Sequence, residues 1–236
     1  MPIQPLMTEF AHKLLKSLDD NVISILVYGS AVNGNYHPGV SNVNVAVVVR
    51  NLDSHVLDEV LEVVQWGRKR KIALPLFLTK EYILNSLDVF PIEFSGIKQQ
   101  HKVVFGEDVF KDLDIPRKDI ALLCEQQIKG KLLHLRQAYL ENGSNLRVLK
   151  NFLLAAFTDL VPVFKQLIHL KDQQPAQHKE EMLKQLAGIY ALKPEALLSA
   201  YHDKHKKTLI PSRQVKAHLQ NFLDQLETLS RHLDSL

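Results

Sequence analysis

The sequence predicts an α+β protein with two domains: a mixed β-sheet domain with flanking helices over residues 1–116, and an all-α antiparallel helical bundle over residues 117–236. Before residue 117, short β-branched runs alternate with helical patterns, which is typical of a sheet covered by helices. After it, apolar residues recur three and four positions apart, as they do when each helix buries one face in a bundle. A chain of 236 residues is long enough for two such cores.

The strands of the first domain are expected at residues 22–28, 43–49, 72–78, 92–94 and 101–105. One helix is expected before the first strand, because Leu14, Leu15 and Leu18 share a helical face. A second helix is expected between the second and third strands, where valines recur over residues 56–64 and Asp53 or Ser54 supplies the N-cap.

The second domain divides into helices at its turn residues. The first helix ends at Asn142-Gly143, and a long apolar stripe over residues 146–170 follows, with Pro162 inside it, where a kink is expected. A polar loop is expected at residues 171–177, then two short helices near residues 182–186 and 194–201. The last helix begins near Pro211 and its stripe continues to residue 233.

Composition limits the functional classes. The formal net charge of +3 is too small to indicate nucleic-acid binding by itself. The apolar stretches are short of the roughly 18 to 20 residues that span a bilayer, and the first ten residues lack the features of a signal peptide. The single cysteine, Cys124, excludes an intramolecular disulfide and is expected to be a buried, inert thiol. These features predict a cytoplasmic protein without a membrane partner.

The functional signal lies in residues 27–49, VYGSAVNGNYHPGVSNVNVAVVV. A strand ends in Gly29-Ser30, a glycine-containing loop follows, and the next strand opens with Asn42 and Asn44. A Gly-Ser pair after a strand lets the backbone approach a phosphate closely and adds a hydroxyl donor. Because side chains alternate along a strand, Asn42 and Asn44 are expected on the same face.

The order and spacing of this segment resemble the DNA polymerase β-type nucleotidyltransferase superfamily, including small bacterial members related to kanamycin nucleotidyltransferase. In that family a strand leads to Gly-Ser, then to a loop with a glycine, then to Ser-Asp-x-Asp at the start of the next strand. Gly29, Ser30, Gly34 and Ser41 match this pattern, and the resemblance covers roughly residues 20–110. The family takes a third carboxylate from a later strand, and the resemblance implies Glu93 as the candidate for it.

The chain departs from the family at the paired aspartates, where it has Asn42 and Asn44. In the family those carboxylates hold two magnesium ions, which neutralise the triphosphate and activate the attacking hydroxyl. A unit charge pair about 4 Å apart contributes about 4 kcal/mol at an effective dielectric near 20, so losing two charges lowers metal affinity by orders of magnitude. Asparagine is also no general base, which leaves Glu93 as the one candidate catalytic and metal-binding carboxylate of the motif.

We therefore predict a catalytically degenerate nucleotidyltransferase fold that acts as a sensor or scaffold. Nucleotide or phosphate binding would be kept by Gly29, Ser30, Gly34, Ser41, Asn42 and Asn44. One alternative is an active nucleotidyltransferase that uses Mg²⁺ and an NTP to modify a small-molecule or protein acceptor. The expected partners are a nucleotide and a protein, which can be a second copy of the chain, because the long helices can expose apolar surface.

A basic run, Arg68, Lys69, Arg70 and Lys71, follows Trp66-Gly67 at the end of the second expected helix. It can contact phosphate or nucleic acid, with Arg68, Arg70 and Lys71 as candidate residues. It can equally be a basic helix end that complements the helix dipole.

Arg213 and His218 have the Arg-x4-His spacing that resembles the motif of HEPN-type ribonucleases, with Gln214 where that family usually has Asn or Asp. This resemblance implies a second alternative, a ribonuclease or toxin–antitoxin-type partner, and chance spacing on an amphipathic helix is the other interpretation. His202 and His205 are interpreted as part of a solvated basic loop, because the neighbouring lysines would repel a cation.

Overall fold

The computed structural model describes residues 3–32 and 42–234. The chain forms two compact units, Met1–Pro116 and Arg117–Leu236. The first contains a sheet flanked by helices, and the second is helical throughout its regular structure. The predicted α+β fold class is therefore confirmed.

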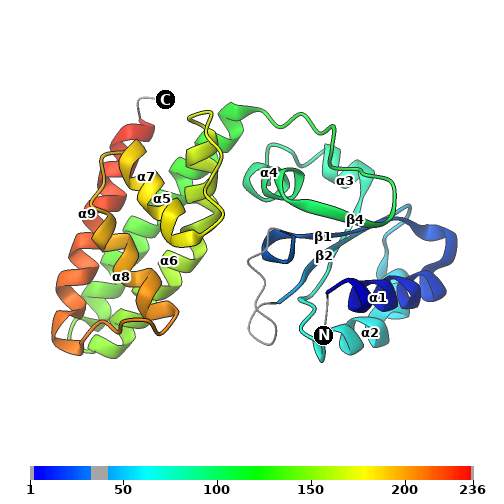
Figure 1. Cartoon of the computed structure of the whole chain (residues 1–236), viewed down its shortest axis with the longest axis horizontal. Helices are drawn as coiled ribbons and strands as arrows, with labels where there is room; N and C mark the ends of the chain where they lie inside the picture. The colour runs from blue at the N-terminus through cyan, green and yellow to red at the C-terminus, as the bar shows by residue number, and fades with distance from the viewer. Residues whose placement is uncertain (1–2, 33–41, 235–236) are drawn as a thin grey trace. The chain divides into compact units, whose positions relative to one another are not determined.

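The first unit is built on a four-stranded mixed sheet of order β3-β2-β1-β4 (Figure 1). The central strand β1 (Val22–Tyr28) is antiparallel to both of its neighbours, β2 (Asn44–Val49) and β4 (His101–Gly106). The edge strand β3 (Leu76–Thr79) is parallel to β2. The end of β1 and the start of β2 therefore lie side by side at one end of the sheet.

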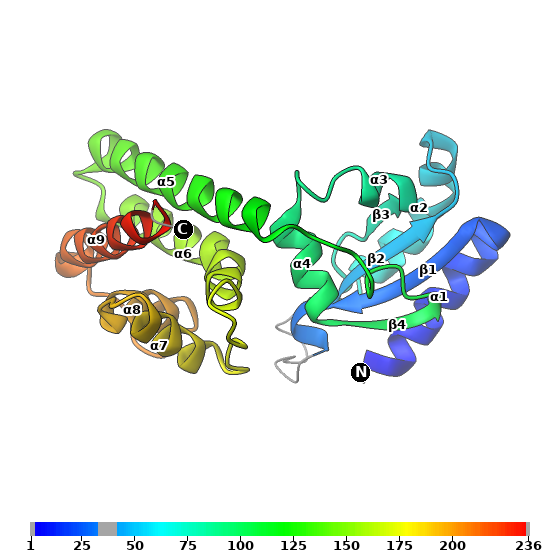
Figure 2. The same cartoon turned by 90° about the horizontal axis from the view of Figure 1, so that it is seen from above.

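The sheet separates two hydrophobic cores, with helices on both of its faces (Figures 1 and 2). Helices α1 (Ile3–Leu18) and α2 (Ser54–Arg68) cover the face to which Val45 and Val47 of β2 point. Helices α3 (Lys80–Leu84) and α4 (Pro91–Gln99) cover the face to which Ala46 and Val48 point. The alternation along β2 thus assigns each of its side chains to one of the two cores.

The N-cap expected at the start of α2 is present, because the Asp53 side chain accepts a hydrogen bond from Val56 N at 2.9 Å. The strand expected at residues 72–78 is shorter than predicted. Ile72 forms one isolated bridge to Val43, and the continuous ladder of β3 begins at Leu76. Pro75 separates the two because proline has no N–H to donate to a ladder.

The prediction of a strand at residues 92–94 is wrong, because these residues lie in the first turn of α4. Pro91 stands at the first helical position and Glu93 lies in the first turn. Both are favoured there, since proline has the helical φ and a carboxylate complements the positive end of the helix dipole. The hydrophobic pattern of so short a run did not reveal this helix start.

The second unit is a bundle whose long helices are α5 (Arg117–Asn142), α6 (Leu146–His169) and α9 (Val215–Leu233). Two shorter helices, α7 (Lys179–Ile189) and α8 (Pro194–Lys204), pack against α6, and a 3-10 turn, η3 (Ser212–Gln214), leads into α9. Cys124 is buried on α5, as predicted. Pro162 lies inside α6, which continues through it.

Among the described residues, α6 is the one helix long and apolar enough to cross a membrane by length and composition. This corrects the expectation that the apolar stretches are too short. Half of its apolar window is buried within the bundle, which is also the pattern of a core helix in a globular protein.

Candidate functional site

The backbone turns at the end of β1 through a short 3-10 segment, Gly29–Ala31. Gly29 has a φ of 75°, a conformation that side chains disfavour. Its N–H donates to Gln100 O at 3.1 Å, which ties the turn to the start of β4. A Cβ at Gly29 would lie 3.1 Å from Asn44 Nδ2. Glycine therefore lets the turn approach the Asn44 side chain closely.

Asn44 begins a row of three side chains across the end of the sheet. In the strand register it lies opposite Tyr28 on β1, and Tyr28 lies opposite His101 on β4. The row is on the face covered by α3 and α4, where Tyr28 is half-buried. Burial raises the pKa of the Tyr28 hydroxyl, so it remains a neutral hydrogen-bonding group. Asn42, two residues before Asn44, is exposed.

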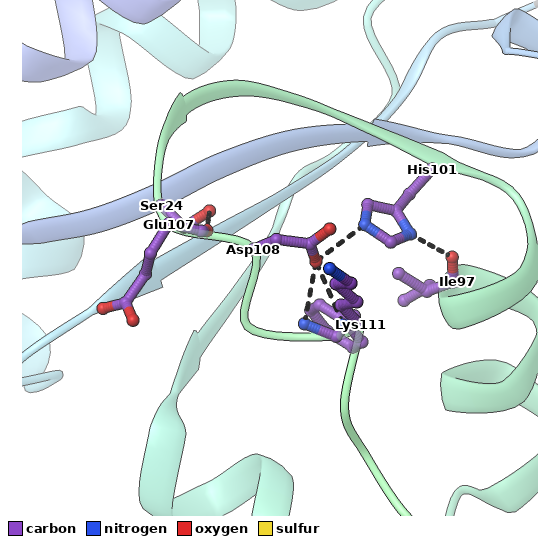
Figure 3. A network of polar contacts seen from close by, with 7 residues as sticks. Ser24, Ile97, His101, Glu107, Asp108 and Lys111 are labelled. Atoms are coloured by element: carbon purple, nitrogen blue, oxygen red, sulfur yellow. Dashed lines mark hydrogen bonds and ion pairs between the residues drawn. The ribbon is translucent and has the colours of Figure 1, made fainter.

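His101 is held by hydrogen bonds at both ring nitrogens (Figure 3). Nδ1 lies 2.8 Å from Ile97 O, and Nε2 lies 2.8 Å from Asp108 Oδ1. The same carboxylate oxygen accepts from Phe110 N at 3.2 Å and Lys111 N at 3.0 Å. His101 therefore has no free nitrogen for a metal or a substrate proton, and Asp108 is committed to shaping the turn after β4.

The other acid after β4 is also engaged. Glu107 O accepts a hydrogen bond from Ser24 Oγ at 2.6 Å (Figure 3), and its carboxylate pairs with Lys80 at 2.6 Å. The strand β4 itself, HKVVFG, contains no Asp or Glu. The later strand next to β1 thus brings no free carboxylate to the Asn44 row. The sequence analysis did not predict the His101–Asp108 pair. The only signal for it in the sequence is the acidic pair Glu107-Asp108 directly after an apolar run.

Of the other predicted site residues of the motif, the structure describes Glu93. Glu93 is exposed on the first turn of α4, and no described contact joins it to Asn42 or Asn44. Gly34 and Ser41 lie outside the described residues. Within residues 3–32 and 42–234, no group of three His, Cys, Asp or Glu side chains is arranged to hold a metal ion. The structure thus brings Gly29 to Asn44 but does not bring Glu93 to them.

The basic run after α2 lies beside the same end of the sheet. Lys71 O accepts a hydrogen bond from Val43 N at 2.8 Å, and Ala73 N donates to Val43 O at 2.9 Å. Lys71 is therefore next to the chain segment that carries Asn42 and Asn44. Arg70 instead lies over the Trp66 ring, with Cζ 4.1 Å from the ring centroid.

The bundle does not assemble the predicted Arg213–His218 pair. His218 lines a cavity of about 410 Å³ with Ser199 and His202, while Arg213 is exposed on η3 and does not line it. His218 Nδ1 lies 3.1 Å from Ser199 Oγ. His202 Nε2 lies 3.3 Å from a Glu180 oxygen, a contact that the sequence did not suggest.

No protein-family model matches the sequence, and no curated protein matches it. Among solved structures the chain is similar to a spectinomycin adenyltransferase from Enterococcus faecialis, crystallised with ATP and spectinomycin. The identity is 15%, the match covers 93% of this chain and 97% of the other, and the TM-score is 0.59. The chain therefore shares the fold of this adenyltransferase over nearly its whole length.

Proposed function

We propose that this protein is a catalytically degenerate nucleotidyltransferase that binds a nucleotide or its phosphates as a sensor or scaffold. The observation that carries the proposal is the neutral amide of Asn44 packed against the Gly29 turn. The sequence resemblance aligns this residue with a metal-binding aspartate of the family. The turn and its close backbone approach are kept, whereas the charge that would hold a metal is absent.

Two magnesium ions do not fit the described residues. Mg²⁺ prefers carboxylate oxygens in near-octahedral geometry, and Asn42 and Asn44 offer one neutral oxygen each. Asp108, the carboxylate in the turn after β4, already contacts His101 Nε2 and accepts from two backbone N–H groups. No catalytic step through magnesium follows from this arrangement.

The alternative is an active enzyme that moves a nucleoside monophosphate from an NTP to a small molecule or protein. The ATP and spectinomycin of the structural neighbour favour it. It would require Glu93, exposed on α4, to act as the general base and metal ligand. The amide pair argues against this alternative, because neither side chain can carry the charge that two-metal transfer needs.

Calorimetric titration of ATP and GTP into the purified protein, with Mg²⁺ and with EDTA, tests the proposal. Binding in EDTA that magnesium does not strengthen supports the degenerate fold. Binding that requires magnesium would overturn it in favour of the enzyme, and Glu93→Gln would then abolish transfer. If neither nucleotide binds under either condition, the proposal of nucleotide binding is wrong and only the scaffold role remains.

For the scaffold, a protein partner or a second copy of the chain is proposed. The bundle offers apolar side chains for such a contact on α5, where Leu140 is 84% exposed and Leu122 is 65% exposed. Sedimentation at two protein concentrations would detect self-association. The cytoplasm remains the predicted compartment.

A further inference from the structure

The basic turn, Arg68–Lys71, has a backbone that is fixed beside β2. Its N–H groups close back on α2, with Arg70 N donating to Gly67 O at 2.8 Å and Lys71 N to Arg68 O at 3.2 Å. On its other side Lys71 O accepts from Val43 N. A Cβ at Gly67 would lie 3.0 Å from the Phe10 ring, so the turn is also packed closely against α1. The turn therefore presents its side chains from a rigid base.

The charges of this turn are not neutralised within the protein. All four side chains are exposed, and in the described part of the chain none of them pairs with a carboxylate. Residues 1–116 hold 11 Lys and Arg against 14 Asp and Glu. The turn is therefore a local concentration of positive charge on a unit that is otherwise net negative.

Lys71 occupies a backbone conformation that does not suit lysine. Its φ is 67°, in the left-handed region where Gly and Asn are preferred. Its exposed side chain fills no core. A lysine held in a disfavoured conformation, with its carbonyl bonded to the residue after Asn42, points to a role for its charge.

We propose that the basic turn replaces the divalent metal of the family, so that this end of the sheet binds the polyphosphate group of its ligand without magnesium. The inference rests on the proposed function and names the chemistry of the same site. The Lys71 ammonium and the Arg68 guanidinium donate charge-assisted hydrogen bonds to phosphate oxygens. The Asn42 and Asn44 amides add N–H donors, where carboxylates would repel the same oxygens.

Magnesium therefore competes with the protein for the ligand. Free ATP carries more negative charge than its magnesium complex, and the basic turn is attracted to that charge. We expect excess Mg²⁺ to weaken ATP binding several-fold, which is the opposite of the effect in a two-metal enzyme.

The test uses ATP and inorganic tripolyphosphate as probes, each titrated calorimetrically in EDTA and in excess Mg²⁺. Lys71→Asn removes the charge while keeping a residue that tolerates the left-handed backbone, and Arg68→Gln removes the second charge. Each variant should weaken binding of both probes by about fivefold. The matched control is Lys111→Gln, which removes an equal charge at an exposed position of the same unit outside the basic turn, and it should change binding by less than twofold.

Trp66 is the only tryptophan of the chain and lies against Arg70 of the basic turn. Tripolyphosphate does not absorb where tryptophan is excited, so its binding at the turn should change Trp66 emission directly. Lys71→Asn should shift that titration to higher tripolyphosphate concentrations. An unchanged emission during calorimetrically detected binding would place the ligand elsewhere and overturn the inference.

The outcomes separate this inference from the proposed function. ATP binding that is unaffected by Lys71→Asn and Arg68→Gln overturns the inference and leaves nucleotide binding standing. Tripolyphosphate binding that depends on Lys71, without ATP binding, supports the basic turn as an anion site and removes the nucleotide as its ligand. Equal losses in all three variants would indicate general attraction by net charge and would also overturn it. Binding of neither probe overturns both proposals.

Discussion

The sequence predicts one short motif in each unit of the molecule. The residues of the first, Gly29 and Asn44, lie close together in the structure, whereas those of the second, Arg213 and His218, do not line the same cavity. In the sheet, Asn44 lies beside β1 and against the Gly29 turn. In the bundle, His218 lines a cavity and Arg213 lies outside it on η3. Paired strands hold the residues of the first motif together, whereas no strand pairing among the described residues holds Arg213 next to His218.

The difference follows from the geometry of the two kinds of element. Antiparallel pairing fixes which residues lie opposite each other, so two positions on paired strands are neighbours whenever the register holds. On a helix each residue turns the chain by about 100°, so residues five apart point about 140° away from each other. The 3-10 turn before α9 changes that angle further. A strand motif is therefore the stronger predictor of a site in this chain.

The largest expected effect comes from restoring the carboxylates of the strand motif. The double variant Asn42→Asp with Asn44→Asp should bind Mg²⁺ or Mn²⁺ at least tenfold more tightly than the original chain, because two negative charges are added close together at the start of β2. Calorimetric titration of the metal measures this change.

The matched control is Asn51→Asp with Asn85→Asp, which adds the same charge at exposed positions of the same unit. It should leave metal binding unchanged. Equal metal binding by both double variants, or by neither, would show that the alignment of Asn42 and Asn44 with the family aspartates is wrong.

The next largest effect concerns the turn that supports the strand motif. Gly29→Ala should destabilise the protein by about 1–2 kcal/mol, because alanine disfavours the left-handed backbone, and its Cβ would press on Asn44. Gly130→Ala on α5 meets open space and should stabilise by about 1 kcal/mol, since alanine is the better helix former. Urea unfolding followed by Trp66 emission and far-UV circular dichroism measures both. Equal effects of the two substitutions would argue that the Gly29 turn is not constrained.

The positions of most elements could be predicted because their patterns are long or their caps are explicit. The strand over residues 22–28 is rich in β-branched residues, and it is observed with those bounds. The helix between the second and third strands could be anchored on Asp53, whose cap bond is present. The run at residues 92–94 was too short for its period to distinguish strand from helix, and the Pro91 signal at its start decided the outcome.

The candidate site was predictable only as far as local sequence determines it. Gly29 directly follows β1 and Asn44 begins β2, so their proximity follows from one antiparallel strand pairing. The His101–Asp108 pair and the contact of Lys71 with Val43 depend on how distant segments pack. Such tertiary contacts leave no periodic signal in one sequence.

A smaller effect is expected in the bundle on acidification. Burial, and then the charge of Lys165, lower the pKa of His169 below its ordinary value of 6.5. The unfolded chain therefore binds a proton that the folded chain resists, and stability falls as the pH drops from about 6.5 towards the folded pKa. Melting temperatures at pH 7.5 and pH 6 measure this slope. His169→Gln should reduce it, whereas the exposed His12→Gln should not, and equal slopes in both variants would contradict the assignment.

The smallest effect is expected from the helical motif itself. Because Arg213 does not reach the cavity lined by His218, the pair cannot bring a cation and a proton carrier to the same phosphate. Incubation with a single-stranded RNA should give no cleavage that depends on His218, and His218→Ala should match the original chain. His218→Ala also removes the contact with Ser199, so His218→Gln is the better-matched control for packing. RNA cleavage that both substitutions abolish would contradict this prediction. It would show that the helical motif marks the functional site and that the bundle is the catalytic unit.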